Sequence, residues 1–168
     1  ASYTNPCILT GVRFICWNQI PGDYLEFGCY SGQSFAYAYK TMAQTRKSVI
    51  KQLSGVDKKN YEAKIPRFFA FDSFEGLPNI SSADNHPYFP KHWKKRRFSM
   101  GLSEFRNFLQ KRGITENVHI VKGWYREILT NNLKTAHGLQ KASMVHIDCD
   151  YYESALLVLE FITDLVDD

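Results

Sequence analysis

Asp148 and Asp150 are the residues of this sequence that point most directly to chemistry. They follow an apolar run at 144–147 that is typical of a buried strand, and a helical segment begins at about Glu153. Carboxylates at the end of a strand can hold a hard cation such as Mg²⁺, and a carboxylate can also act as a general base. The alternative is that one of the two acids caps the following helix. We expect at least one of them to have a functional role.

A glycine turn after the run Asp23–Phe27 is the second chemical feature. The run is too short for a stable helix and fits a buried strand. Gly28 and Gly32 permit a tight turn and the close approach of a ligand to the backbone, and Ser34 can cap a helix that opens there. Doubly wound α/β proteins hold cofactors at such a place, although G-x-x-x-G is not the dinucleotide-binding pattern. The alternative is a plain strand-to-helix turn.

A second strand, Arg67–Asp72, also ends in an acid. At this position of a cofactor-binding α/β fold, a carboxylate accepts hydrogen bonds from the two ribose hydroxyls. The acid ordinarily lies about twenty residues after the glycine turn. Here the basic segment 44–64 intervenes, so the assignment of Asp72 depends on strand order. We interpret the basic segment as a solvated helical extension and loop, the alternative being a binding patch.

The remaining pattern predicts one α/β domain over residues 1–168, with alternating strands and helices. An amphipathic helix is expected before the first strand, within residues 1–21. Another helix is expected at Gly101–Arg112, then a third strand at Val118–Val121 and a short crossover at 126–139. These elements predict a Rossmann-like doubly wound parallel sheet.

The long segment 79–100 contains Pro87 and Pro90 and several aromatic side chains, with little regular pattern. A structureless loop of this length inside a domain is commonly a lid or a disordered segment. Its aromatic residues favour a lid that is mobile without substrate and orders over the cofactor pocket when substrate binds.

Composition excludes some classes of protein. A hydrophobic content of 44% excludes a disordered chain, and a formal charge of +4 does not by itself indicate nucleic acid. No apolar run approaches the length of a membrane span, and no signal-peptide pattern begins the chain. The cysteines form neither a C-x-x-C pair nor a regular framework, which predicts a reducing, cytoplasmic location; they are Cys7, Cys16, Cys29 and Cys149.

Four segments between Pro21 and Val166 together resemble a known family. They are Leu25-Glu26-Phe27-Gly28 with Gly32 and Ser34, the F-D-S-F-E-G-L-P segment Phe71–Pro78, Gly123-Trp124, and the segment His146–Ser154, which contains I-D-x-D-x-Y-E-S. The chain is similar to the macrocin O-methyltransferase (TylF-like) family of class I S-adenosylmethionine-dependent methyltransferases. D-S-F-E-G-L-P and I-D-x-D-x-Y-E-S are the specific parts of this resemblance, whereas the glycine turn is generic.

The resemblance implies methylation of a hydroxyl on a small molecule, such as a sugar or natural product, with help from Mg²⁺. It implies that Asp148 is a metal ligand and that Asp150 is the general base. It also implies a set of S-adenosylmethionine-binding residues around the methionine end, the ribose and the adenine: Glu26, Phe27, Gly28, Ser31, Gly32, Ser34, Asp72, Ser73, Gly123 and Trp124. The expected partner is a small-molecule hydroxyl acceptor, and a homo-oligomer is compatible with this interpretation.

Two departures from the family pattern are expected to matter. Only the first four strands of a seven-stranded methyltransferase sheet have counterparts here, so we expect the fourth strand to be an open edge and the domain to be C-terminally truncated. The family's metal site is completed by an Asp-Asp pair on a later strand, and we interpret Asp167-Asp168 as a helix-to-strand turn instead. Two alternative functions stay open: a nucleic-acid methyltransferase using the basic run Lys94–Arg97, and a non-catalytic nucleoside- or cofactor-binding module.

Overall fold

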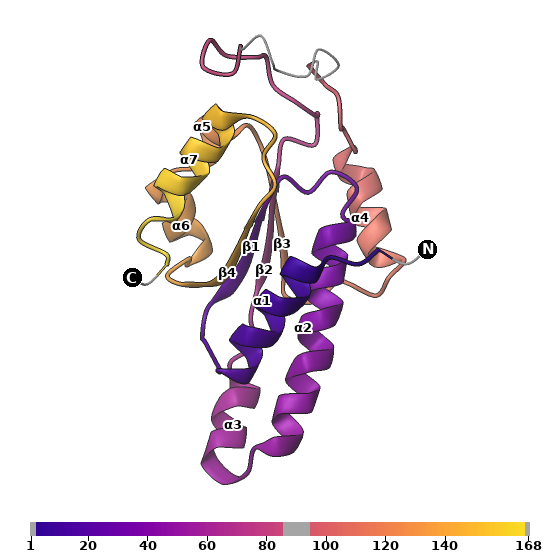
Figure 1. The fold of residues 1–168 in the computed structure, drawn as a ribbon, viewed down its shortest axis with the longest axis vertical. Helices are drawn as coiled ribbons and strands as arrows, with labels where there is room; N and C mark the ends of the chain where they lie inside the picture. The colour runs from indigo at the N-terminus through magenta and orange to yellow at the C-terminus, as the bar shows by residue number, and fades with distance from the viewer. Residues whose placement is uncertain (1–2, 86–94, 167–168) are drawn as a thin grey trace.

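Four short parallel strands form the centre of the structure, a computed structural model that describes residues 3–85 and 95–166 (Figure 1). The sheet order is β3-β2-β1-β4. The strands are β1 (Asp23–Phe27), β2 (Phe68–Asp72), β3 (Val118–Lys122) and β4 (Ala142–Ile147). From β1 the chain goes first to one side of the sheet and later returns to the other, so β1 and β4 flank a topological switch point. The predicted doubly wound parallel sheet is confirmed.

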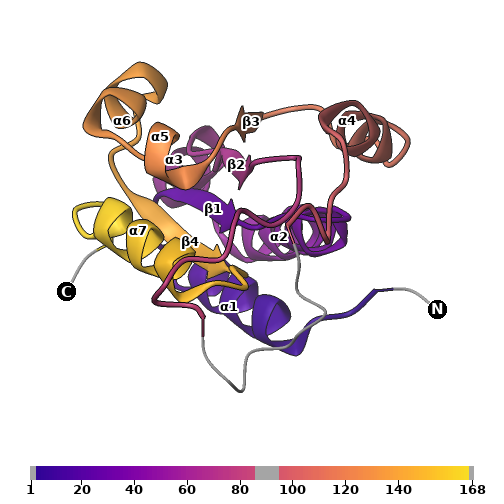
Figure 2. The same ribbon diagram turned by 90° about the horizontal axis from the view of Figure 1, so that it is seen from above.

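Helices cover both faces of this sheet (Figures 1 and 2). One layer contains α1 (Pro6–Trp17), α2 (Gln33–Gln52) and α4 (Leu102–Gln110). The opposite layer contains α5 (Tyr125–Ile128), α6 (Asn131–His137) and α7 (Tyr152–Ile162). The remaining helix, α3 (Gly55–Ala63), follows α2 at the amino ends of the strands. The segment expected only as a crossover between β3 and β4 therefore contains two short helices.

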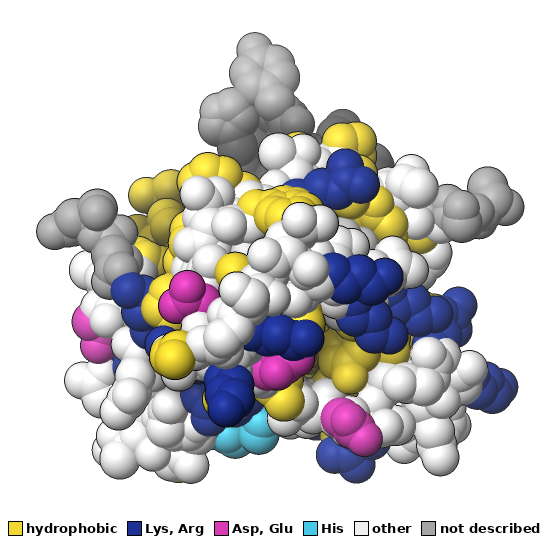
Figure 3. All heavy atoms as spheres, turned by 90° about the horizontal axis from the view of Figure 1, so that it is seen from below, with side chains coloured by type: hydrophobic (Ala, Val, Ile, Leu, Met, Phe, Trp, Pro, Cys, Tyr) yellow, Lys and Arg dark blue, Asp and Glu magenta, His cyan; other side chains and the backbone are white. Residues whose placement is uncertain are grey.

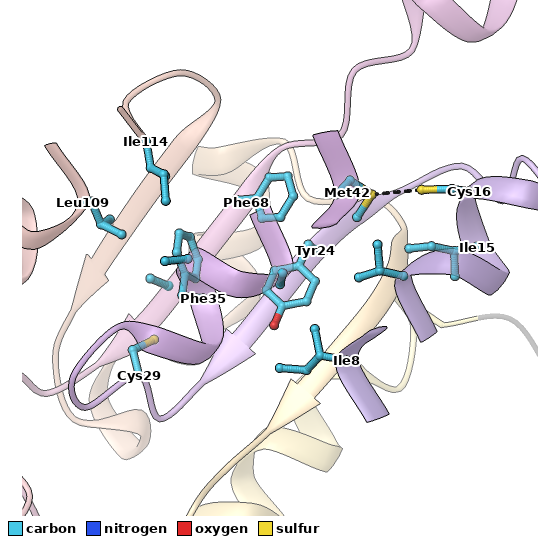
Figure 4. Packing of buried hydrophobic residues seen from close by; sticks show 14 of the residues in the cluster. Ile8, Ile15, Cys16, Tyr24, Cys29, Phe35, Met42, Phe68, Leu109 and Ile114 are labelled. Atoms are coloured by element: carbon cyan, nitrogen blue, oxygen red, sulfur yellow. Dashed lines mark hydrogen bonds between the residues drawn. The ribbon is translucent and has the colours of Figure 1, made fainter. Parts of the chain in front are cut away.

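Each face of the sheet has its own apolar core, because successive side chains of a strand point to opposite faces. On the α1–α2 face, Tyr24 packs edge-on against Phe35 and also contacts Phe68 (Figure 4). On the α7 face, the rings of Phe27 and Phe71 stack with their centroids 4.5 Å apart. Strands buried on both faces read as continuous apolar runs, which is why β1 and β2 were recognisable.

The neighbouring strands β1 and β4 differ in how deeply their residues are buried. Every residue of β1 is buried, whereas in β4 only Ala142 is buried and the residues up to Ile147 are half-exposed. Among the strands that the structure describes, β4 pairs with β1 alone. The expectation that the fourth strand forms an edge is confirmed.

The basic segment 44–64 is more helical than expected. It comprises the end of α2 and the whole of α3. Arg46 is not part of a solvated patch: its guanidinium lies 4.2 Å from the centre of the Tyr61 ring and donates to the Tyr61 carbonyl oxygen at 2.8 Å, which ties α2 to α3. Seen from below, this end of the molecule carries Lys and Arg side chains with acidic and apolar ones between them (Figure 3).

The start of α2 corrects one expectation. Ser34 does not cap this helix; Gly32 occupies the N-cap position and makes no side-chain hydrogen bond. Ser34 lies within the first turn, where its hydroxyl donates to the buried carboxyl group of Glu26 at 2.7 Å. The buried acceptor therefore takes the hydroxyl away from the helix amides.

The proposed lid falls partly outside the described residues, because 86–94 and the terminal Asp167-Asp168 are not among them. The two described stems of this loop are joined: the Leu77 amide donates to the Arg97 carbonyl oxygen, and the Arg96 amide donates to the Leu77 carbonyl oxygen, both at 2.9 Å. No helix in the described part of the chain is long and apolar enough to cross a membrane.

Candidate functional site

A cavity of about 650 Å³ opens at the carboxyl ends of the strands, the end that faces the viewer in Figure 2. Each strand is followed by a residue that lines it: Gly28 after β1, Ser73 after β2, Gly123 after β3 and Asp148 after β4. The carboxyl ends of parallel strands diverge at a switch point, which leaves room for a ligand between the loops. The volume suits a ligand of cofactor or drug size.

The structure brings only part of the predicted site to this cavity. The predicted residues that line it are Gly28, Asp72, Ser73, Gly123, Trp124, Asp148 and Asp150. The predicted cofactor residues that do not line it are Glu26, Phe27, Ser31, Gly32 and Ser34. The residues after the strand ends therefore converge, whereas the side chains within β1 and at the start of α2 are used elsewhere.

Asp72 joins the ends of β1 and β2. One carboxylate oxygen, Oδ2, accepts the amides of Cys29 at 2.8 Å and Tyr30 at 3.2 Å, and Oδ1 accepts the Phe74 amide at 2.7 Å. A carboxylate has about four lone-pair positions, so one acceptor position stays open on Oδ1. Asp72 can thus hold the glycine turn and still accept a hydroxyl group from a ligand in the cavity.

Gly28 is required by contact with the chain that follows β4. Its φ is +88°, and a Cβ atom at this position would lie 2.3 Å from the carbonyl oxygen of Asp148. The Asp148 amide also donates to the Phe27 carbonyl oxygen at 2.9 Å. Because Gly28 has no side chain, the glycine turn can lie directly against the turn that contains Asp148 and Asp150, here called the acidic turn.

Glu26 forms a buried network beneath the cavity. Its carboxyl oxygens accept the hydroxyls of Tyr24 at 2.5 Å and Ser34 at 2.7 Å, and the residue is 0% exposed. Burial raises the pKa of Glu26 to about 8, although the two hydrogen bonds act in the opposite direction. This carboxyl group is held by its own protein neighbours and supports the start of α2.

The other predicted cofactor residues outside the cavity also have structural contacts. Phe27 belongs to the core on the α7 face, and Gly32 lies under Phe105 and Phe108 of α4, 2.9 and 3.1 Å from where its Cβ would be. Ser31 is half-exposed in the turn that leads to α2.

The two acids after β4 face the same cavity. In an extended strand they would point to opposite faces, since side chains alternate. However, β4 ends at Ile147, so Asp148 and Asp150 stand in an irregular turn. Partial burial raises the pKa of Asp150, and the neighbouring Asp148 carboxylate raises it further. The turn thus brings both acids to the lining of one cavity.

The acidic turn fits a magnesium ion in part. Mg²⁺ keeps several waters and is commonly held by one or two carboxylates together with substrate oxygens. Asp148 and Asp150 supply two such carboxylates. Among residues 3–85 and 95–166, no group of three or more His, Cys, Asp or Glu side chains is arranged to hold a metal ion. A dedicated all-protein metal site is thus not found within those residues.

Several residues of the cavity wall were missed from the sequence. Tyr30, 52% exposed, meets the ring of Phe98 edge-on at 5.8 Å, and both line the cavity. Arg126 pairs with Glu153 at the start of α7, and both residues also line it. Glu153 belongs to the I-D-x-D-x-Y-E-S segment and Tyr30 lies within the glycine turn, so their sequence positions could have indicated that these two residues line the site. Nothing local indicates Arg126, because its partner comes from another element.

Comparison with known proteins agrees with this geometry. The family model described as "Methyltransferase domain" matches residues 25–168. The fold resembles that of the O-methyltransferase NovP, with a TM-score of 0.69 and 21% identity over 95% of this chain and 59% of NovP. It also resembles the calicheamicin methyltransferase CalS11, with a TM-score of 0.67 and 21% identity over 96% of this chain and 60% of CalS11.

The chain thus spans about 60% of the length of these two solved relatives, and at such identities the likeness concerns the fold. No curated protein sequence matches the chain significantly. The family match covers most of the chain, including β2, β3, β4, the last three residues of β1, and both Asp148 and Asp150. The chain therefore belongs to the methyltransferase domain family.

Proposed function

We propose that this chain forms the cofactor-binding part of an S-adenosylmethionine-dependent O-methyltransferase. Its acceptor is a hydroxyl group of a small molecule, a sugar or another natural product, as in the macrocin O-methyltransferase (TylF-like) family. One observation carries the proposal: an acid suited to ribose and two acids suited to base and metal chemistry line a single cavity at the strand ends. A pure binding module would need only the first of these.

The donor would bind across the ends of β1, β2 and β3. Asp72 has one free acceptor position on Oδ1 for a ribose hydroxyl, beside its backbone contacts. Gly123 and Trp124 would flank the adenine, since both line the cavity after β3. Gly28 would offer backbone to the methionine end.

The relatives support the choice of acceptor class. NovP is described as an O-methyltransferase, and CalS11 as a TDP-rhamnose 3′-O-methyltransferase of calicheamicin biosynthesis. Their fold is shared by this chain at low sequence identity. A sugar hydroxyl is therefore the acceptor to test first.

Asp150 would act as the base. A sugar hydroxyl is far too weakly acidic to ionise unaided at neutral pH, so its proton must be removed during the reaction. Asp150 would accept this proton, and bound S-adenosylmethionine would supply the methyl group to the hydroxyl oxygen. The raised pKa of Asp150 strengthens it as a base. Asp148 would help to hold Mg²⁺, whose charge would favour the alkoxide.

The rest of the cavity would align the reactants. The oxygen, the methyl carbon and the sulfur must lie nearly in line, and correct placement contributes a large share of the rate. Tyr30, Phe98 and Trp124 form aromatic walls that can restrict the acceptor and exclude water. These walls belong to three different loops, so the site is assembled by the tertiary fold.

Calorimetry with S-adenosylmethionine and S-adenosylhomocysteine, with and without Mg²⁺, tests the first half of the proposal. Transfer of a labelled methyl group to TDP-rhamnose, and to a panel of free sugars, tests the second half. No binding of either cofactor form would overturn the proposal. Binding without transfer to any hydroxyl acceptor would favour the non-catalytic module, and transfer to an oligonucleotide would favour a nucleic-acid methyltransferase.

A further inference from the structure

Asp84 is a buried acid that the methyltransferase chemistry described above does not use. It is 5% exposed and stands in the loop that follows β2. Its Oδ1 accepts the Tyr152 amide at 2.6 Å, and its Oδ2 accepts the Glu153 amide at 3.3 Å and the Ser81 hydroxyl at 2.9 Å. A buried carboxylate needs such donors, because its desolvation is costly without them. The side chain is therefore committed to the first turn of α7.

The helix α7 needs this cap. The residue at its N-cap position, Tyr151, makes no capping hydrogen bond with its own side chain. The first amides of a helix have no partner within the helix and are ordinarily satisfied by a nearby Ser, Thr, Asp or Asn. Here the cap comes from a residue 68 positions earlier in the chain. Figure 2 shows the chain after β2 crossing over the beginning of α7.

This contact joins two walls of the cavity. Asn79, in the same loop as Asp84, lines one wall, whereas Asp150 and Glu153 line the wall at the start of α7. Asp150 stands directly before the Tyr151 N-cap, so the first turn of α7 limits where its carboxylate can lie. Glu153 is further held by its ion pair with Arg126.

We propose that Asp84 is a positioning residue: it fixes the start of α7 against the loop after β2 and thereby holds Asp150 in the cavity. This inference rests on the proposed function for the role of Asp150. Asp84 itself need not touch cofactor or acceptor. The cap links the loop to the base, so displacement of this loop would displace the catalytic turn with it.

Hydrogen exchange measured amide by amide tests the structural part. In Asp84→Ala the amides of Tyr152 and Glu153 should exchange about tenfold faster, the effect of losing a helix cap. The amide of Asp148, bound to the Phe27 carbonyl oxygen, is the internal reference and should not change. Asp57→Ala, which removes an exposed acid of α3, is the matched control. Unchanged exchange at Tyr152 in Asp84→Ala would overturn the proposal.

Kinetics test the functional part, at a temperature where all variants are folded. Asp84→Ala should lower kcat roughly ten- to hundredfold, as expected for a misplaced catalytic group, without changing KM for S-adenosylmethionine. Asp84→Asn should restore part of the rate, because its side-chain oxygen can still accept the Tyr152 amide.

A merely structural role would give a different pattern. Faster exchange throughout the sheet, or faster exchange at Tyr152 with kcat unchanged in Asp84→Ala, would each contradict a positioning role. If the parent protein transfers no methyl group to any acceptor, the proposed function is at fault. The exchange at Tyr152 and Glu153 then decides by itself whether Asp84 holds the start of α7.

Discussion

The ends of β1 and β4 lie side by side but are stabilised in different ways. Every residue of β1 is buried, and the glycine turn after it is held by Asp72 of the neighbouring strand, which accepts hydrogen bonds from the amides of Cys29 and Tyr30. At the end of β4, the strand is a half-exposed edge, and the helix after it is capped by Asp84 from a distant loop. The glycine turn is thus supported by the adjacent strand of the sheet, whereas the start of α7 is supported by a loop outside the sheet.

Asp150→Asn should give the largest effect and should separate chemistry from binding. The amide keeps the shape of the side chain and loses its basicity, so turnover should fall about 10²- to 10⁴-fold, the contribution of a general base. Affinity for S-adenosylmethionine, measured by calorimetry, should stay the same because the proposed donor site is at the ends of β1, β2 and β3. Turnover near that of the parent would remove Asp150 from the mechanism.

A pair of core substitutions tests the difference in burial directly. Phe27→Ala should lower the free energy of unfolding by about 3–5 kcal/mol, because Phe27 is fully buried and stacked on Phe71. Ile147→Ala should cost only about 1–2 kcal/mol, since this residue of the edge strand is half-exposed. Urea unfolding of both variants measures these values. Equal losses would show that the β4 edge is covered in solution.

Asp72→Ala should lower the affinity for S-adenosylmethionine, which Asp150→Asn should leave unchanged. Removing the proposed ribose acceptor should weaken the binding of S-adenosylmethionine by roughly 1.5–3 kcal/mol, or about 10- to 150-fold in Kd, the range for a hydrogen bond to a charged group. The loss includes the loosening of the Cys29 and Tyr30 amides that Asp72 accepts. Equal affinity in variant and parent, measured by calorimetry, would show that the ribose lies elsewhere.

Glu26→Gln tests the burial of β1 through the pH dependence of the free energy of unfolding. Burial raises the pKa of Glu26 from 4.5 to about 8, so the folded state binds this proton more tightly than the unfolded state. The stabilisation is complete below the ordinary carboxyl range and is lost as the pH rises toward 8, by up to roughly 1.4 kcal/mol per pH unit. Glutamine cannot ionise, so urea unfolding of Glu26→Gln should depend less on pH across this window. Parallel pH curves for the two proteins would show that Glu26 ionises normally in the folded state.

The strands were predictable because local apolar runs encode them. The first strand was expected at Asp23–Phe27 and is found there, and the second was expected at Arg67–Asp72 and begins one residue later. Buried parallel strands are apolar on both faces, so the run itself marks the element. The same reasoning placed Asp148 and Asp150 at a strand end, where both line the cavity.

The sequence by itself therefore determined the doubly wound order of elements and the strand ends that meet at the cavity. Only the tertiary structure decided the partners of individual side chains: Ser34 bonds to Glu26 instead of capping α2, Arg46 stacks on Tyr61, and Asp84 caps α7. The physical reason is range. An apolar period acts over a few neighbouring residues, whereas a hydrogen bond or ion pair joins groups that only the folded chain brings together.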